Sequence, residues 1–237
     1  MAGIRERARE ELTEEIVRLA RVQVEREGAA NLSLRAIARD LGMVSSAIYR
    51  YFASRDELLT RLIIDSYDRV GTQVEAADAG VRRRKDFLGR WRAMSHAFRD
   101  WAFANPAEYA LLFGTPVPGY AAPQDTIGPA SRYTIVLIGL VEEMEAAGHT
   151  SSERVPPALR RDYARFRERY AVPASDAMLM QGMGAWAAMM GAISLELFGH
   201  LHNVIDSPGA LFEAVVEGQG RLLVSGTSAA APTSKRT

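Results

Sequence analysis

Side chains of the kinds that contact nucleic acids gather in one short stretch of the sequence. Residues 33–55 hold four arginines against one acid, Asp40, in a chain whose formal net charge is zero. On a helical wheel, small serines open the outward arc, and Tyr49 and Arg50 follow them. Small residues let a helix approach base edges, while tyrosine and arginine contact phosphates or bases. The chemistry indicated is non-covalent recognition of duplex DNA, although the zero net charge adds no support to it.

Catalytic and metal-binding patterns are missing from the sequence. There is no GxSxG, GxGxxG, P-loop or HExxH motif, and there is no cysteine. His200 and His202 would point to different faces of a helix and have no nearby acid pair. We therefore expect a protein that is not an enzyme, with no cofactor and no metal. The rival reading as an enzyme would need an unrecognised acid–base pair in the C-terminal half.

Targeting signals are also missing. The N-terminus is densely charged and has no apolar segment of the kind that secretory signals carry. The most apolar stretch, 177–201, is interrupted by Gln181, Glu196 and four glycines, so we expect a buried helix there. We expect a cytoplasmic protein that does not span a membrane.

Apolar residues recur at helical spacing almost throughout, which predicts an all-α fold. Two N-terminal stripes end at glycines, Gly28 and Gly42, a third consists of Val44, Ile48 and Phe52, and a fourth runs over 58–70. A weak boundary lies at 76–85, where the apolar pattern stops. Beyond it we expect helices over 85–104, 106–113, 125–147, 155–169, 175–202 and 208–225.

Helix-start signals agree with this pattern. Ser33 is a candidate N-cap, and Ser54 with Glu57 forms a capping box in which Glu57 would reach back to the Ser54 amide. Asn105-Pro106-Ala107-Glu108 repeats the same logic, with proline at the first helical position. Ser207-Pro208 predicts another helix start.

The stretch 33–52 has the form of a helix-turn-helix. One helix would run from Ser33 to Leu41, and a second from about Ser45 to Phe52, with Gly42 taking the left-handed conformation between them. The wheel places Val44, Ile48 and Phe52 on the buried side of the second helix. Each part also has a plain structural explanation: the serines as caps, the arginines as a solvated face and the tyrosines as core.

The whole string is more specific than its parts and resembles the TetR family of regulators. The matching segments are LRAIARDLGM (34–43), SAIYRYF (46–52) and SRDELL (54–59). The resemblance implies DNA contacts from both helices of the motif and from the start of the next helix. The implied contact residues are Ser33, Arg35, Ser45, Ser46, Ala47, Tyr49, Arg50, Tyr51 and Arg55.

Their implied roles differ. Ser45, Ser46 and Ala47 would face the bases, and Arg50, at a variable position, could read a guanine. Ser33 and Arg35 would contact the backbone or groove edge, Tyr49 and Tyr51 the phosphates, and Arg55 a phosphate at a helix N-terminus. On the wheel Tyr51 projects near the buried side, which makes it a weaker candidate than Tyr49.

The resemblance divides the chain into a DNA-binding domain at 1–70, a helical ligand-binding and dimerisation domain at 71–226, and a disordered tail at 227–237. Residues 101–120 resemble the C-terminal domain of the TetR subtype named for a Trp-His-Gly signature. In the corresponding run, 188–191, Met190 stands in place of the histidine.

Aromatic residues are dense in the C-terminal half beside a Pro/Gly-rich loop, which suits an apolar pocket. They would equally suit a plain core. The candidate pocket residues are Trp91, Phe98, Trp101, Tyr109, Phe113, Tyr120, Tyr133, Met183 and Trp186. A small apolar or aromatic effector is the expected ligand.

The resemblance also implies that the last two long helices, 175–202 and 208–225, pair with those of a second copy. The candidate interface residues are Ala187, Gly191, Leu195, Phe198, Leu211 and Val215. The alternative is a single helix buried within one chain. A two-fold dimer would read a pseudo-palindromic operator. We expect a homodimeric repressor released by its ligand, or a DNA-binding scaffold that dimerises without one.

Overall fold

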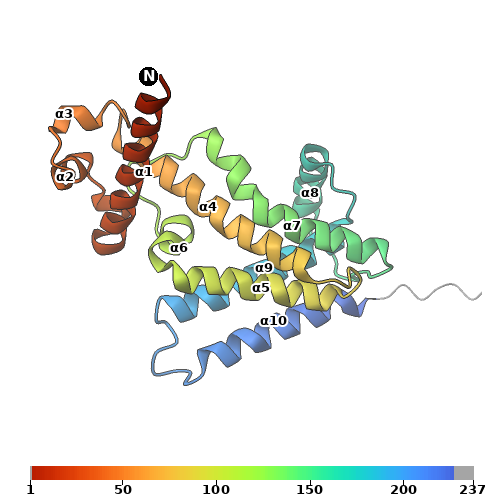
Figure 1. Cartoon of the computed structure of the whole chain (residues 1–237). Helices are drawn as coiled ribbons and strands as arrows, with labels where there is room; N and C mark the ends of the chain where they lie inside the picture. Colours follow the sequence, from red (N-terminus) through yellow and green to blue (C-terminus); the bar gives the residue numbers. More distant parts are fainter. Residues whose placement is uncertain (1, 227–237) are drawn as a thin grey trace, which may run out of the picture. The chain divides into compact units, whose positions relative to one another are not determined.

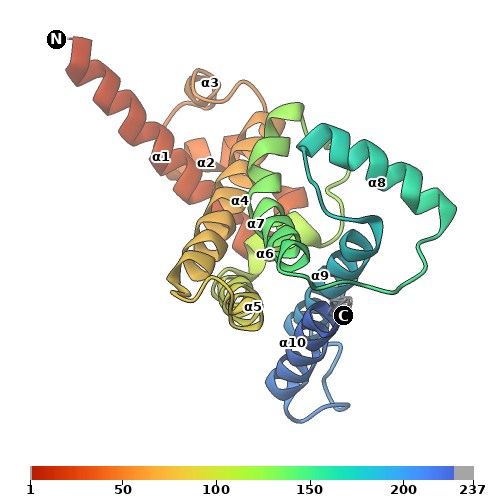
Figure 2. The same ribbon diagram turned by 90° about the vertical axis from the view of Figure 1, so that its right-hand side faces the viewer.

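The computed structural model describes residues 2–226, and within this range every regular element is a helix (Figures 1 and 2). The all-α expectation is therefore confirmed. The expected tail, 227–237, lies outside the described residues. The helices are α1 (Ala2–Glu27), α2 (Leu34–Asp40), α3 (Ser45–Ile48), α4 (Arg55–Gly80), α5 (Phe87–Ala104), α6 (Pro106–Phe113), α7 (Ile127–Ala146), α8 (Pro157–Tyr170), α9 (Asp176–Leu197) and α10 (Pro208–Ser225), with short 3-10 turns η1 (Ala29–Asn31) and η2 (Gln124–Thr126).

The described residues form two compact units, and neither is continuous in sequence. The first unit holds the residues up to 72 together with 101–132, and the second holds 73–100 together with those from 133 on. We expected one division at residue 70. Instead, α4, α5 and α7 each contribute residues to both units. Apolar periodicity does not reveal such a division, because each of the three helices continues across it.

The first unit is built around the apolar stripes predicted for its N-terminal helices. Ile16 and Ala20 of α1 are fully buried, as are Ile48 of α3 and Leu58 and Leu59 of α4. Together with the apolar residues of α2 they form one cluster, and residues of α6 pack against it. A helix as short as α2 or α3 is stable only through such packing.

Ion pairs hold α1, α4 and α6 together inside the first unit. Asp65 of α4 accepts hydrogen bonds from Arg21 of α1 at 2.7 Å and from Arg61 at 2.8 Å. Glu108 of α6 accepts from Ser66 and pairs with Arg69, both on α4. The expected capping box at Asn105 is therefore wrong. Helix α6 does begin at Pro106, but the Asn105 side chain makes no cap hydrogen bond and Glu108 is used in the ion pair.

In the second unit, α9 and α10 lie side by side as a helical hairpin, which both views show (Figures 1 and 2). The expected helix over 175–202 ends earlier, at Leu197, because Gly199 takes a left-handed φ of 75° just beyond it. Among the described residues, α9 alone is long and apolar enough to cross a membrane, and 39% of its most apolar window is buried. Its packing on α8 and α10 suits a core helix.

A buried arginine joins three helices of the second unit. Arg90 of α5 is 1% exposed and donates hydrogen bonds to Asp78 of α4 at 2.7 Å and to Glu143 of α7 at 2.6 Å. Asp78 also accepts from Arg84 at 2.6 Å. Burial by itself would raise the pKa of the Asp78 carboxyl, but the hydrogen bonds from Arg90 and Arg84 outweigh it and hold this pKa below its ordinary value.

This network predicts a strong and acid-sensitive contribution to folding. Arg90→Met should lower the free energy of unfolding by about 3 kcal/mol, because it leaves the largely buried Asp78 carboxylate without its main partner. Because the pKa of Asp78 is lowered in the folded state, its ionised carboxylate stabilises the fold at pH values above the ordinary carboxyl pKa of about 4. That stability is lost as the pH falls through the folded-state value.

Urea unfolding at about pH 7 and about pH 3 checks both points. Asp78→Asn should be less stable than the wild type at neutral pH and should lose less on acidification. An acid response equal to that of the wild type would contradict the role given to Asp78.

Candidate DNA-binding surface and effector pocket

The helix-turn-helix begins with a capped helix. The Ser33 hydroxyl accepts a hydrogen bond from the Ala36 amide at 3.4 Å, so Ser33 is the N-cap expected for α2. Gly42 has a φ of 66°, the left-handed conformation expected at the end of this helix. The Met43 amide then donates to the Ala38 carbonyl at 2.8 Å. These bonds fix the direction in which the chain enters α3.

The second helix of the motif is shorter than expected. Helix α3 covers only Ser45–Ile48, whereas we expected it to reach Phe52. Helix-like turns continue beyond it, because Tyr51 and Phe52 donate to the Ile48 carbonyl at 2.9 and 3.2 Å. The periodicity correctly predicted a helix that begins at Ser45, but the regular helix ends four residues earlier than predicted.

The exposed arc consists of Val44, Ser45, Ser46, Tyr49 and Arg50, and we call it the recognition arc. Four of these five residues were expected to face outward. Val44 was expected to be buried and is 72% exposed. Val44 is the N-cap of α3 with extended backbone, so the helical wheel does not apply to it. Tyr49, although aromatic, is 43% exposed.

The opposite face is anchored in the core of the first unit. Ile48 is fully buried and Phe52 is 5% exposed, as expected. Ala47 was expected to face the bases and is only 7% exposed, because it shares this inner face with Ile48. Tyr51 is half-buried and packs against the same core, in line with its place near the buried side of the wheel.

The arginines of this region fall into two groups. Arg35, Arg39 and Arg50 are exposed, and within the described residues none of them pairs with a hydrogen-bond acceptor. Arg55 differs, because its guanidinium donates to the Ala29 and Ala30 carbonyls, both at 3.0 Å. Three guanidinium groups are thus available to a polyanion, while the fourth holds the η1 turn in place.

The start of α4 carries the expected box in a modified form. Ser54 accepts from the Glu57 amide at 3.1 Å. Glu57 reaches back to the amide of Ala53, at 2.5 Å, and not to that of Ser54. The helix start was therefore predicted correctly and one hydrogen-bond partner was wrong by one residue.

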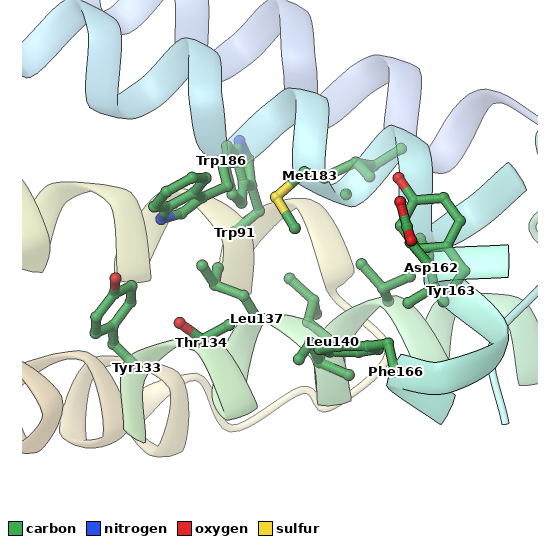
Figure 3. A pocket seen from close by; sticks show the side chains of 15 residues that line it. Trp91, Tyr133, Thr134, Leu137, Leu140, Asp162, Tyr163, Phe166, Met183 and Trp186 are labelled. Carbon is green, nitrogen blue, oxygen red and sulfur yellow. The ribbon is translucent and has the colours of Figure 1, made fainter. Parts of the chain in front are cut away.

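A cavity of about 330 Å³ lies within the second unit, among helices α5, α7, α8, α9 and α10 (Figure 3). Of the expected pocket residues, Trp91, Tyr133, Met183 and Trp186 line it. The further lining residues, which sequence reasoning missed, are Thr134, Leu137, Ile138, Leu140, Val141, Asp162, Tyr163, Phe166, Leu179, Gly182 and Leu223.

The other expected pocket residues do not line the cavity. Phe98 is buried behind it, in edge contact with Tyr133. Four aromatics belong to the first unit: Trp101, Tyr109, Phe113 and Tyr120. Among these, Tyr109 is fully buried, and the Tyr120 hydroxyl bonds to Thr60 at 2.9 Å. Density of aromatics in the sequence did not distinguish core from pocket.

Two glycines allow the helices around the cavity to approach closely. A Cβ on Gly182 of α9 would lie 2.8 Å from Val141 Cγ2 of α7. A Cβ on Gly220 of α10 would lie 2.7 Å from Trp91 Cδ1. The Trp91 indole nitrogen donates to the Val216 carbonyl at 2.8 Å, which fixes this wall of the cavity.

Polar groups are few in the lining. Asp162 is the only carboxylate, and it pairs with Arg165 on the same helix. Burial, followed by the charges of Asp176 and Asp162, raises the pKa of Tyr163, so its phenol stays neutral. The lining contains no Lys, Arg or His. The cavity can therefore hold an apolar molecule and offers no cation to an anionic one.

The expected interface residues of α9 share one face. Ala187, Gly191 and Leu195 are four residues apart and exposed, and Phe198 follows at the C-cap of the helix, 42% exposed. A Cβ on Gly191 would meet no other atom within 4 Å. On α10, Leu211 and Val215 are half-buried. The α9 face formed by Ala187, Gly191 and Leu195 is thus apolar, smooth and exposed.

Comparison with known proteins gives the family. A model described as "Bacterial regulatory proteins, tetR family" matches residues 16–62, and one described as "Tetracyclin repressor-like, C-terminal domain" matches 91–218. The HTH-type transcriptional regulator Rv1816 of Mycobacterium tuberculosis is 42% identical over 232 residues, covering 94% of this chain and 95% of the relative. The chain belongs to the TetR family. The same identity and coverage hold for the HTH-type transcriptional regulator Mb1846 of Mycobacterium bovis.

Solved structures agree with this TetR-family assignment. The structure of the regulatory protein SCO4313 is 34% identical, covers 90% of this chain and 97% of its own, and has a TM-score of 0.76. A Rhodococcus protein, 21% identical with a TM-score of 0.67, shares the fold. This TetR-family chain is a DNA-binding transcriptional regulator, and the relatives named above are regulators and not enzymes.

Two substitutions can separate the capping role of Ser33 from its expected contact with DNA. Ser33→Ala should lower the free energy of unfolding by about 1 kcal/mol, because α2 loses its N-cap. Ser33→Asp keeps a capping oxygen, so its stability should match that of the wild type. Its added negative charge should repel a nearby phosphate and weaken binding to random-sequence duplex DNA in a mobility-shift titration. Unchanged DNA binding by a stable Ser33→Asp would remove Ser33 from the DNA-contact surface.

Proposed function

We propose that this TetR-family regulator is a homodimeric repressor that binds a pseudo-palindromic operator and leaves it when a small apolar effector fills the second-unit cavity. DNA binding would belong to the N-terminal 1–70 region, and effector binding and dimerisation to the region 71–226. We place this activity in the cytoplasm, where regulators of this kind meet chromosomal DNA.

The observation that carries the proposal is the recognition arc. Its serines are small enough for the N-terminus of α3 to approach base edges in the major groove. Exposed Val44 adds an apolar side chain of a kind that contacts thymine methyl groups. Tyr49 and Arg50, with the unpaired Arg35 and Arg39, would bind the phosphates on either side. Val44 and Tyr49 expose apolar surface to water, which does not stabilise the fold. Contact with DNA would explain why these side chains face outward.

The α9 face supports the dimer. Regulators of this family act as dimers, and a face of small and apolar residues permits close packing of a helix against its symmetry mate. Such an interface must bury about 1,200–2,000 Å² to be stable. A two-fold dimer presents two recognition arcs, which suits half-sites about 34–36 Å apart.

The second-unit cavity favours a ligand-responsive regulator over a scaffold that binds DNA without an effector. A plain dimerisation domain would have no need for an apolar cavity of this size among five helices. Release follows if the effector binds better to a conformation whose two arcs no longer match successive major grooves. Helix α4 is continuous from the first unit into the second, so it links the two activities covalently.

Arg50→Ala should raise the dissociation constant for an operator fragment selected from genomic DNA by about tenfold, because a charged hydrogen bond to DNA is lost. Thermal unfolding should remain as in the wild type, since Arg50 is exposed and unpaired. If Arg50 contacts a phosphate, the log–log salt slope should fall by about 1, and if it reads a guanine, preference at one base pair should relax. Mobility-shift titrations at several salt concentrations measure both.

Arg83→Ala is the matched control. Arg83 is exposed as well, but it lies in the connection before α5 and outside the recognition arc. It should leave operator affinity unchanged. Equal operator affinities for Arg50→Ala and the wild type would refute the assignment of the arc.

A further inference from the structure

Trp186 places an unsatisfied hydrogen-bond donor at the cavity. Its indole nitrogen is buried and has no partner within the described residues. The other tryptophan of the lining, Trp91, already donates to the Val216 carbonyl. Most buried donors in folded proteins are paired, and an unpaired one costs free energy that a ligand acceptor can recover.

The carboxylate of the cavity and the unpaired indole lie at opposite ends. Figure 3 shows Trp186 and Tyr133 at one end, whereas Asp162, Tyr163 and Phe166 stand at the other, with Leu137 and Met183 between them. The carboxylate is therefore separated from the free indole by an apolar middle section. A molecule spanning the cavity meets a hydrogen-bond donor at one end and aromatic side chains at the other.

The charges of the lining set the class of ligand. Since the lining has no Lys, Arg or His, nothing compensates the desolvation of an anion such as a carboxylate. The Asp162 side chain is about half exposed to solvent and pairs with the exposed Arg165, so water and Arg165 already stabilise its charge. Burial is favourable only for a neutral molecule, and Trp186 discriminates in favour of one that carries an acceptor.

Resting on the proposed effector role of this cavity, we infer that the effector is a neutral, elongated apolar molecule with a carbonyl- or ether-type oxygen at one end. This oxygen accepts a hydrogen bond from Trp186 Nε1. The remainder of the molecule packs between α7 and α9 and ends against Tyr163 and Phe166 of α8. Trp186 is thus the specificity-determining residue of the pocket.

Three probes with one naphthalene skeleton test this inference: 2-acetylnaphthalene, 2-isopropenylnaphthalene and 2-naphthoate. The first two are nearly isosteric and differ in a carbonyl oxygen against a methylene group. Titration calorimetry with the full chain gives the ratio of their dissociation constants. In Trp186→Phe the dissociation constant of the ketone should rise about fivefold relative to that of the olefin. One hydrogen bond to the ketone is lost, while most of the aromatic area is kept. The anionic 2-naphthoate should bind at least about tenfold more weakly than the ketone.

Met183→Leu is the control, because it alters the lining next to Trp186 without removing a donor. It should change the affinities of both neutral probes alike. If Trp186→Phe does not fold, the indole N–H signals of the ¹⁵N-labelled wild type give the answer. One of the three tryptophan signals should move further downfield with the ketone than with the olefin, because the two probes share the naphthalene ring current and differ in the hydrogen bond.

The outcomes separate this inference from the function on which it rests. If both neutral probes bind but their ratio is the same in the wild type and Trp186→Phe, the hydrogen bond is refuted and the effector pocket stands. An unchanged ratio would also result if the indole kept a hydrogen bond to water in both complexes, and this too would refute the hydrogen bond to the ligand. Tight binding of 2-naphthoate would refute neutrality. If none of the probes binds, the effector pocket itself is refuted, and the inference falls with it.

Discussion

The recognition arc depends on the burial of two side chains behind it. Helix α3 has only four residues, and a helix of one turn does not form by itself in water because its nucleation is unfavourable. Ile48 and Phe52, buried in the core of the first unit, supply what local hydrogen bonding cannot. The left-handed Gly42 then sets the direction in which the helix leaves its neighbour. Exposure of the arc is thus a consequence of packing.

Sequence periodicity predicted the two helices and the turn of this motif, but not the exposure of Val44 or the partners of Arg55. The buried stripe and the turn at Gly42 follow from residue spacing, which a single sequence contains. The exposure of Val44 does not, because a wheel assumes helical backbone and Val44 lies one residue before the helix. Arg55 was expected at a phosphate, and its carbonyl partners lie 25 and 26 residues earlier in the chain. Contacts between distant segments are invisible to periodicity.

The cavity shows the same limit more clearly. The sequence suggested nine pocket residues, and four of them lie in the other unit. The chain enters that unit at Trp101 within α5, so Trp101 and the aromatic residues of α6 and of the connection after it belong to the first unit. The contribution of α8 was missed, since Tyr163 and Phe166 stand in an arginine-rich segment. Their spacing of three residues was the available signal, as it places both on one face. The small residue Gly182 is as important as the aromatics, because it admits Val141 of the facing helix.

We propose that the chain has a charged, exposed surface for DNA and an apolar cavity for an effector. Regulation by this chain would then depend on two copies that present the recognition arc to one duplex. Hydroxyl-radical footprinting of the selected operator tests this most directly. We expect two protected segments related by pseudo-two-fold symmetry, with centres about 34–36 Å apart along the helix axis. One unsymmetrical protected segment, or protection that does not depend on sequence, would contradict it.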